Sequence, residues 1–284
     1  MKIGFFATGV MGRLDFEAYV RWGADAGFGS IDVKPEQANA RQICERYHMP
    51  IASTYGFAAE PMQSDDVART REMEKARKAI DLASEQNIPT VGLGTKRDPK
   101  LNAADNVDLF KVTYGELARH AEAKGVKIVF ENWPERGQRL ASTPELWEAM
   151  FTAVPSPALG LCFDPSHLVW QGIDWQRALR EFASRVYHAH AKDTEILTEG
   201  AYRHGIYGPQ LSAAAKGTSG WFRYRLPGYG VVDWAAYVST LHEVGFDGAL
   251  TIEHEDVVWG WLDDPEHAKK GLLVGKRFLE QYVV

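Results

Sequence analysis

The chain has very few cysteines and no long hydrophobic segment. Cys44 and Cys162 stand in unrelated segments of the 284 residues, so they predict neither a disulfide framework nor a cysteine-ligated zinc site. No stretch approaches the roughly 20 apolar residues of a membrane span. The apolar run at residues 3–6 is too short for a signal peptide and has no cleavage site after it. We therefore expect a cytoplasmic protein with no membrane partner.

The sequence also carries no strong charge of one sign and no phosphate-binding loop. Its net charge is −6, from 32 basic and 38 acidic residues, which argues against nucleic acid as a partner because phosphate contacts need clustered Lys and Arg. The segment Pro227-Gly228-Tyr229-Gly230 is only a weak glycine signal. Recognition of a phosphate group is therefore not indicated.

Strand-like and helix-like segments alternate along the whole chain. The expected strands lie near residues 2–7, 30–34, 50–55, 90–94, 126–131, 158–163, 186–191 and 248–253. The expected helices lie near residues 15–27, 36–48, 65–87, 103–124, 143–153, 174–184, 233–244 and 265–282. Strict alternation predicts a parallel sheet with helical crossovers. Eight such units favour an α/β fold, a single (β/α)8 TIM barrel over residues 1–284.

The ends of the expected helices carry residues that commonly cap them. Asp15, Ser64, Ser142 and Asp233 each precede a helical segment, and their side-chain oxygens can accept hydrogen bonds from the first turn. We expect these four residues to be N-caps.

One connection breaks the alternation. Residues 194–232 follow the seventh strand, are rich in Gly, Tyr and Arg, and are long for a connection between a strand and a helix. In a barrel this connection lies over the C-terminal rim, where active sites are built. It is interpreted as a lid or specificity loop, with a contact surface between subunits of a homo-oligomer as the alternative.

Ionisable residues directly follow four of the expected strands. Glu131, Asp164, His190 and Glu253 each end an apolar run. Burying such groups is costly unless a partner compensates them, and a divalent cation would do so at one rim. Three carboxylates with one imidazole suit Mn²⁺, Mg²⁺ or Co²⁺ better than a structural zinc site. We expect one divalent cation, Mn²⁺ being favoured, with Mg²⁺, Co²⁺ and Zn²⁺ as alternatives.

Three polar residues of the seventh strand share one face. Side chains alternate in a strand, so His188, His190 and Lys192 point the same way. His190 lies nearer the rim and is the favoured ligand, while His188 is expected deeper, buried and hydrogen-bonded. Lys192 lies near the mouth, where it either binds substrate oxygens or pairs with Asp193.

Further candidates suit a hydroxyl-rich substrate. His167 follows Asp164 by three residues and suits hydrogen bonding to a hydroxyl or carbonyl group. Five tryptophans fall in expected rim or loop regions, where they either cover a sugar ring or pack helices against the barrel: Trp133, Trp170, Trp221, Trp259 and Trp261. We expect Trp133 and Arg225 to be substrate-binding residues.

These motifs together resemble the xylose-isomerase-like superfamily of TIM-barrel sugar (phosphate) isomerases and epimerases, over nearly the whole chain. The resemblance rests on Phe130-Glu131-Asn132, Asp164-Pro165-Ser166-His167, His188-Ala189-His190-Ala191-Lys192-Asp193, Pro227-Gly228-Tyr229-Gly230 and Ile252-Glu253-His254-Glu255-Asp256. The superfamily includes ketose 3-epimerases, inosose isomerases and dehydratases, and endonuclease IV.

The resemblance implies roles for particular residues. It places Glu131, Asp164, His190 and Glu253 at the metal positions and His167 at a substrate-binding position. The ketose epimerases also use an arginine shortly after the metal-binding histidine. Arg203, Arg223 and Arg225 do not match that arginine clearly, which puts simple ketose epimerisation in doubt.

The expected activity is that of a metal-dependent isomerase or epimerase acting on a sugar or keto-sugar. A cation bound beside a carbonyl group acidifies the neighbouring carbon-bound proton and stabilises the enediolate, with Glu131 and Glu253 as candidate bases. The alternative is a metal-dependent lyase or dehydratase acting on a keto-sugar, keto-glycoside or inosose. A DNA-repair endonuclease is disfavoured by the acidic net charge, and a non-catalytic sugar-binding protein would show no proton exchange.

Overall fold

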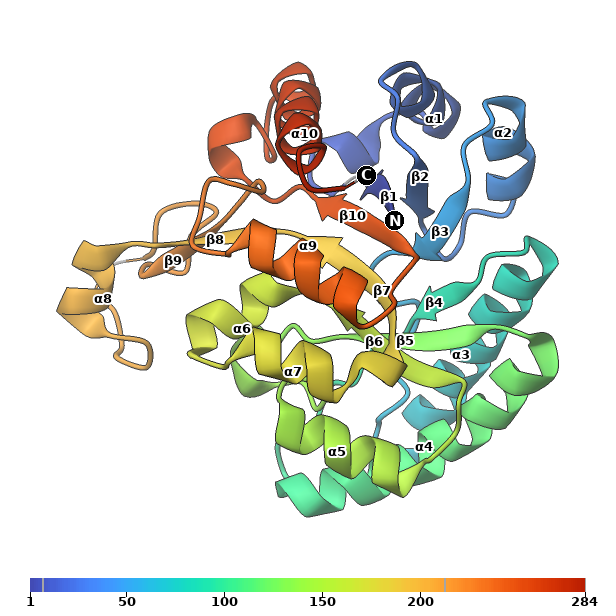
Figure 1. Cartoon of the computed structure of the whole chain (residues 1–284). Coiled ribbons are helices and arrows are strands. Elements are labelled where there is room, and N and C mark those ends of the chain that lie inside the picture. The colour runs from blue at the N-terminus through green and yellow to red at the C-terminus, as the bar shows by residue number, and fades with distance from the viewer. Residues whose placement is uncertain (7, 212, 284) are drawn as a thin grey trace. The chain divides into compact units, whose positions relative to one another are not determined.

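The computed structural model describes residues 1–6, 8–211 and 213–283 (Figure 1). Contacts divide the chain into two compact units. The first comprises Met1–Ile31, Asp164–Arg180 and His190–Val284, and the second comprises Asp32–Phe163 and Glu181–Ala189. Strands β2 (Ser30–Val33) and β7 (Val186–Ala191) each contain residues of both units.

All eight expected strands are present, and the fold is an α/β TIM barrel. These strands are β1 (Lys2–Phe6), β2 (Ser30–Val33), β3 (Ile51–Thr54), β4 (Thr90–Gly92), β5 (Lys127–Glu131), β6 (Leu159–Phe163), β7 (Val186–Ala191) and β10 (Ala249–Glu253). Position 7, the end of the first expected strand, lies outside the described residues. The alternation of short apolar runs with amphipathic segments therefore predicted the strands correctly.

The eight expected helices are also confirmed. They are α1 (Phe16–Asp25), α2 (Ala40–Arg46), α3 (Asp66–Glu85), α4 (Ala103–Lys124), α5 (Pro144–Ala153), α7 (Trp175–Glu181), α9 (Trp234–Glu243) and α10 (Pro265–Leu279). The structure adds the short helices α6 (Pro165–Gln171) and α8 (Thr198–His204). It also adds four 3₁₀ turns: η1 (Met11–Arg13), η2 (Glu135–Gly137), η3 (Ala183–Arg185) and η4 (Val257–Trp259). Among the described residues, no helix is both long and apolar enough to cross a membrane.

In the first unit, β1 pairs in parallel with β10 and with the start of β2. Phe6 lies opposite Glu253 in the register, so the carboxyl ends of both strands fall at one edge. Phe5 packs against Tyr19 and Phe28, with ring centroids 5.0 and 4.4 Å away. Gly23 permits this packing, because a Cβ atom there would lie 2.1 Å from the Phe5 ring. The α1 helix is thereby fixed against β1.

In the second unit, β4, β5, β6 and β7 pair in parallel in that order. Every residue of β6 is buried, as expected for a parallel sheet that is covered on both faces. Cys162 on β6 and Cys44 on α2 are both buried, and neither is in a disulfide bond. Burial raises the pKa of the Cys44 thiol to about 12, so this cysteine is protonated at neutral pH.

Two of the four expected helix caps are confirmed and two are wrong by one residue. Asp15 accepts a hydrogen bond from Ala18 N, and Asp233 accepts one from Ala236 N. In place of Ser64, Asp65 caps α3 through Ala68 N. In place of Ser142, Thr143 caps α5. The following residue, Pro144, has the backbone geometry of a first helical position, and this sets the cap at residue 143.

The long connection after β7 contains a two-stranded antiparallel ribbon. Strands β8 (Asp193–Ile196) and β9 (Phe222–Arg225) pair so that Thr194 lies opposite Tyr224. Helix α8 lies between them in the sequence, and Figure 1 shows it beyond the ends of β8 and β9. The connection is therefore an ordered insertion rather than a simple loop. Position 212 within it lies outside the described residues.

The buried carboxylate of Asp193 holds the end of this insertion together. Its two oxygens accept hydrogen bonds from five N–H groups: the backbone nitrogens of Thr194, Gly228, Gly230 and Val232, and the indole nitrogen of Trp234. Burial raises the pKa of Asp193, against the opposing effect of these donors. A Cβ atom on Gly230 would lie 2.3 Å from the carboxylate, which explains glycine there.

Replacing Asp193 by alanine should destabilise the protein strongly. The Asp193→Ala change leaves several buried N–H donors without an acceptor, and each such donor costs about 1–3 kcal/mol. We expect the free energy of unfolding, measured by urea denaturation, to fall by about 3 kcal/mol or more. The exposed Asp263 is the control, and Asp263→Ala should change stability by no more than about 0.5 kcal/mol. Equal effects of the two variants would contradict the role assigned to Asp193.

Candidate metal and substrate site

Three of the expected metal ligands come together within the first unit. Asp164 follows β6 and caps α6, its Oδ1 accepting a hydrogen bond of 2.8 Å from Ser166 N. His190 lies on β7, and Glu253 is the last residue of β10. All three are buried, and each offers a ligand atom within 4.8 Å of the other two.

The geometry of these three residues fits a cation. The Nδ1 atom of His190 lies 3.1 Å from Oε2 of Glu253 and 4.0 Å from Oδ2 of Asp164. Two carboxylates with one imidazole form a donor set for hard or borderline divalent cations. Their oxygens already converge on a positive charge, the ammonium group of Lys192.

Lys192 is almost completely buried among acidic groups. Its Nζ atom lies 2.5 Å from Oε2 of Glu253, 3.2 Å from Oδ2 of Asp164 and 3.4 Å from Oε2 of Glu255. The alternative that Lys192 simply pairs with Asp193 is not what the structure shows, because the Asp193 carboxylate is held by five N–H donors. Lys192 is thus the positive group that compensates these carboxylates.

Glu131 is the last residue of β5, in the second unit, and lies opposite Cys162 in the register between β5 and β6. Its side chain is half-buried. Its participation in one ligand set with Asp164, His190 and Glu253 stays a prediction.

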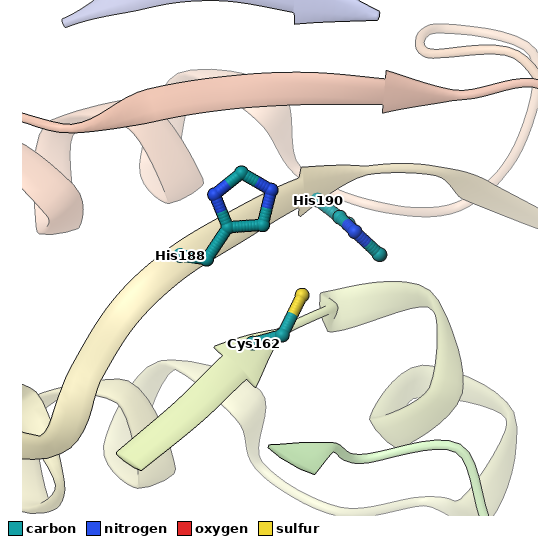
Figure 2. Close-up of side chains that lie close together, drawn as sticks. All are labelled: Cys162, His188 and His190. Carbon is teal, nitrogen blue, oxygen red and sulfur yellow. The ribbon is translucent and has the colours of Figure 1, made fainter. Parts of the chain in front are cut away.

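His188 is the deeper of the two histidines of β7, as expected. It is buried, and its Nε2 atom lies 2.7 Å from Oδ2 of Asp32. Figure 2 shows His188 and His190 along β7, with Cys162 on the adjacent strand β6. Because His188 is already engaged by a carboxylate of its own unit, His190 stays the preferred metal ligand on this strand.

His167 lies one turn of α6 beyond Asp164 and is completely buried. Its Nε2 atom is 3.4 Å from Oδ2 of Asp164. Its Nδ1 atom is 2.9 Å from the hydroxyl group of Tyr224, a residue of β9. The aromatic ring of Tyr224 also lies beneath the Lys192 ammonium, at 4.6 Å. Burial raises the pKa of Tyr224 well above its usual value, against the opposing effect of Lys192.

Tyr224 was not predicted from the sequence. The signal for it was weak, because β9 is four residues long and surrounded by polar and glycine-rich sequence. Phe222 and Tyr224 are two positions apart and would share one face of a strand. This pattern is informative only if residues 222–225 are already known to form a strand.

The other candidates for substrate binding have packing partners in the structure. Arg225 donates from Nε to Asp256 at 2.8 Å and also pairs with Glu195. Trp133, in the second unit, is half-buried and stacks parallel to Phe57 with centroids 6.4 Å apart. A substrate-binding role for Arg225 and Trp133 stays a prediction.

A separate cavity lies in the second unit. Its volume is about 510 Å³, and its lining includes Lys34, Lys75, Lys78, Tyr55 and Phe57. None of the expected site residues lines it, so the cavity does not mark the site that the strand ends form. The chemistry of the strand-end residues is the stronger indication of function.

A family model described as "Xylose isomerase-like TIM barrel" matches residues 16–280. The chain belongs to this family. The match includes all eight candidate site residues, and it confirms both the fold and the family expected from the motifs.

Two relatives in the family align with about half of the chain. The Bacillus subtilis protein YfiH, described as uncharacterised, is 32% identical over 145 residues, which is 50% of this chain and 44% of YfiH. An inosose dehydratase of Geobacillus thermodenitrificans is 28% identical over 148 residues, which is 52% of this chain and 47% of that protein. The chain thus spans less than half the length of these relatives.

Solved structures of the same fold align over nearly the entire chain. A D-psicose 3-epimerase from Clostridium cellulolyticum H10 has a TM-score of 0.75 at 15% identity, covering 99% of each chain. The IolI protein with a bound zinc atom has a TM-score of 0.73 at 17% identity, covering 100% of this chain and 99% of its own. At these identities the similarity shows the fold alone.

Removing the charge of Lys192 should strengthen metal binding. In the Lys192→Met variant, a cation no longer competes with the ammonium group for the oxygens of Asp164 and Glu253. We expect Mn²⁺, measured by isothermal titration calorimetry, to bind about tenfold more tightly or better.

The exposed Lys111 on α4 provides the matched control, and Lys111→Met should leave the affinity unchanged. Asp164→Asn should weaken binding, because it removes a charged ligand. Unchanged or weaker Mn²⁺ binding by Lys192→Met would contradict this account of the site.

His254, the residue after Glu253, should make the free energy of unfolding depend on pH. Burial lowers the pKa of His254 to about 4, and the neutral ring accepts from Asp256 N and lies 3.2 Å from the Trp259 carbonyl oxygen. The unfolded chain binds this proton near pH 6.5, so the stability from neutral His254 is present above pH 6.5 and is lost as the pH falls toward 4. We expect a loss of about 3 kcal/mol across this window.

Urea denaturation at several pH values tests this expectation. Because other groups also titrate, the comparison is between the wild type and His254→Gln, whose free energy of unfolding should fall less between pH 6.5 and 4. Parallel pH dependence in the two proteins would contradict it.

Proposed function

We propose that this protein is a divalent-metal-dependent isomerase or epimerase that acts on a sugar or keto-sugar. The observation that carries the proposal is the buried cluster of Asp164, His190 and Glu253 around the Lys192 ammonium. In a TIM barrel, catalytic groups commonly come from the C-terminal ends of several strands. The cluster has that placement, because Asp164 directly follows β6, His190 is the next-to-last residue of β7 and Glu253 ends β10.

Asp164, His190, Glu253 and Glu131 would hold the cation, Mn²⁺ being favoured among divalent ions. When bound, the cation would polarise a substrate carbonyl group and stabilise the negative charge of an enediolate. The bound zinc atom of the structurally similar IolI protein supports a divalent metal of some kind.

The protein's own carboxylates would move the proton. Glu253, whose Oε2 atom lies 2.5 Å from Lys192 Nζ and 3.1 Å from His190 Nδ1, is one candidate base, and Glu131 is the second. Removal of a proton by one carboxylate and its return to the opposite face gives epimerisation. Return at the neighbouring carbon gives isomerisation. His167 and Lys192 would donate hydrogen bonds to substrate oxygens, with Trp133 and Arg225 as further contacts.

A lyase or dehydratase acting on a keto-sugar, keto-glycoside or inosose is the second candidate. The 28% identity to an inosose dehydratase favours it. The engagement of Arg225 by Asp256 and Glu195 also favours it, because no arginine is then evident for the position that ketose epimerases use. Loss of a β-hydroxyl group from the same enediolate gives this reaction.

We also propose the partner, the location and the oligomeric state of the enzyme. The partner is a small-molecule carbohydrate, with no nucleic acid or membrane involved, and the enzyme acts in the cytoplasm as a single TIM-barrel domain that can form a homo-oligomer. The structural likeness to a D-psicose 3-epimerase supports a carbohydrate ligand.

Exchange of substrate protons with solvent tests the proposal. The Mn²⁺-loaded enzyme is incubated in D2O with ketoses, 3-keto-glycosides and inososes, and exchange is followed by proton NMR. We expect exchange at one carbon, and at least a hundredfold slower exchange in Glu131→Gln and in Glu253→Gln, because each removes a base. The exposed Glu266 on α10 is the control, and Glu266→Gln should exchange normally.

Exchange retained in both Glu131→Gln and Glu253→Gln would contradict the proposal. The product mass then separates the two candidate reactions. An unchanged mass supports isomerisation or epimerisation, whereas loss of water or an aglycone supports the lyase or dehydratase.

A further inference from the structure

The ribbon inserted after β7 contributes a polar group to the candidate site. Tyr224 lies on β9, and its hydroxyl group contacts Nδ1 of His167 at 2.9 Å. The two rings are perpendicular, with centroids 5.3 Å apart. On the other side of the imidazole, Nε2 of His167 lies 3.4 Å from Oδ2 of Asp164. Tyr224, His167 and Asp164 therefore form a continuous chain of polar contacts.

The carboxylate of Asp164, at one end of this chain of contacts, selects one tautomer of His167. A carboxylate oxygen accepts hydrogen bonds and repels a lone pair, so Nε2 of His167 carries the proton where it faces Asp164. The Nδ1 atom is then an acceptor, and the Tyr224 hydroxyl group must donate to it. The raised pKa of Tyr224 keeps that hydroxyl group protonated, as a donor requires.

The position of Tyr224 is fixed from several sides. Phe222, on the same face of β9, stacks on Trp170 of α6 with centroids 4.7 Å apart. Across the ribbon, the hydroxyl group of Thr194 donates to the Ser166 carbonyl oxygen of α6 at 3.1 Å. These contacts hold the ribbon against the helix that carries His167, so Tyr224 meets the imidazole at a defined angle.

We propose that Tyr224 is a positioning residue that holds His167 as an Nε2–H donor directed into the site. The insertion is then part of the catalytic site, because it determines which nitrogen of His167 donates. The tautomer stands on the geometry alone. That this N–H meets a substrate oxygen, a hydroxyl or carbonyl group, rests on the proposed function.

The tautomer can be measured without any substrate. Two-dimensional ¹H–¹⁵N NMR of the protein labelled with ¹⁵N-histidine distinguishes the two neutral forms, and the His167 signals are assigned by their loss in His167→Gln. We expect the Nε2–H form in the wild type and a substantial Nδ1–H population in Tyr224→Phe, which lacks the donor to Nδ1. Tyr229→Phe, which alters an exposed tyrosine of the same insertion, should match the wild type.

Two results would overturn the proposal. One is an Nδ1–H tautomer in the wild type. The other is an unchanged tautomer in Tyr224→Phe, which would reduce Tyr224 to a packing residue. A loss of thermal stability alone does not imitate the expected result, because it leaves the tautomer of the folded protein as it was.

A kinetic measurement links the tautomer to the reaction. With a substrate found by proton exchange, Tyr224→Phe should lower kcat about tenfold and change KM less than about twofold, since one hydrogen bond near the reacting atoms is weakened. An unchanged kcat together with a shifted tautomer would overturn the catalytic part of the proposal. If no substrate undergoes exchange, the proposed function fails while the tautomer measurement still decides the role of Tyr224.

Discussion

The first unit depends on one buried positive charge, the Lys192 ammonium, inside a cluster of acidic residues. Asp164, Glu253 and Glu255 bring three carboxylates to one place, and their mutual repulsion in a buried setting would be large without compensation. The Lys192 ammonium lies within 3.4 Å of all three. The ammonium thus balances the carboxylates within the chain itself. Under the proposed function, a divalent cation would have to compete with this ammonium group for the same oxygens.

Lys192 and Asp193 are adjacent in the sequence but serve different purposes, because side chains alternate along a strand. Lys192 turns toward the carboxylates, whereas Asp193 turns the opposite way and gathers N–H donors from residues 228–234. These two adjacent residues thus link the acidic cluster to the hydrogen bonds that hold the insertion. His188 and His190 share one face of β7 but have different partners: His188 contacts Asp32, and His190 contacts Glu253.

The sequence was informative wherever buried parallel strands leave a clear pattern. Each of the eight barrel strands has an apolar run, and parallel strands place their carboxyl ends together, so the sequence alone was enough to group Asp164, His190 and Glu253. The ribbon was not predicted, because β8 and β9 consist largely of polar residues and pair across 25 intervening positions. Tyr224 was missed for the same reason. The caps at Asp65 and Thr143 were each displaced by one residue, since neighbouring polar residues compete for that position.

Two carboxylates hold the C-terminal end of the insertion. Asp193 accepts hydrogen bonds from residues 228–232, and Asp256 accepts them from Arg225 and the backbone of Leu226. Residues 197–221 connect the two ribbon strands. Because the entropy of closing a loop grows only slowly with its length, this span can be lengthened, shortened or exchanged in evolution without moving Tyr224. The outer part of the insertion can therefore vary in length and sequence while Tyr224 keeps its place beside His167.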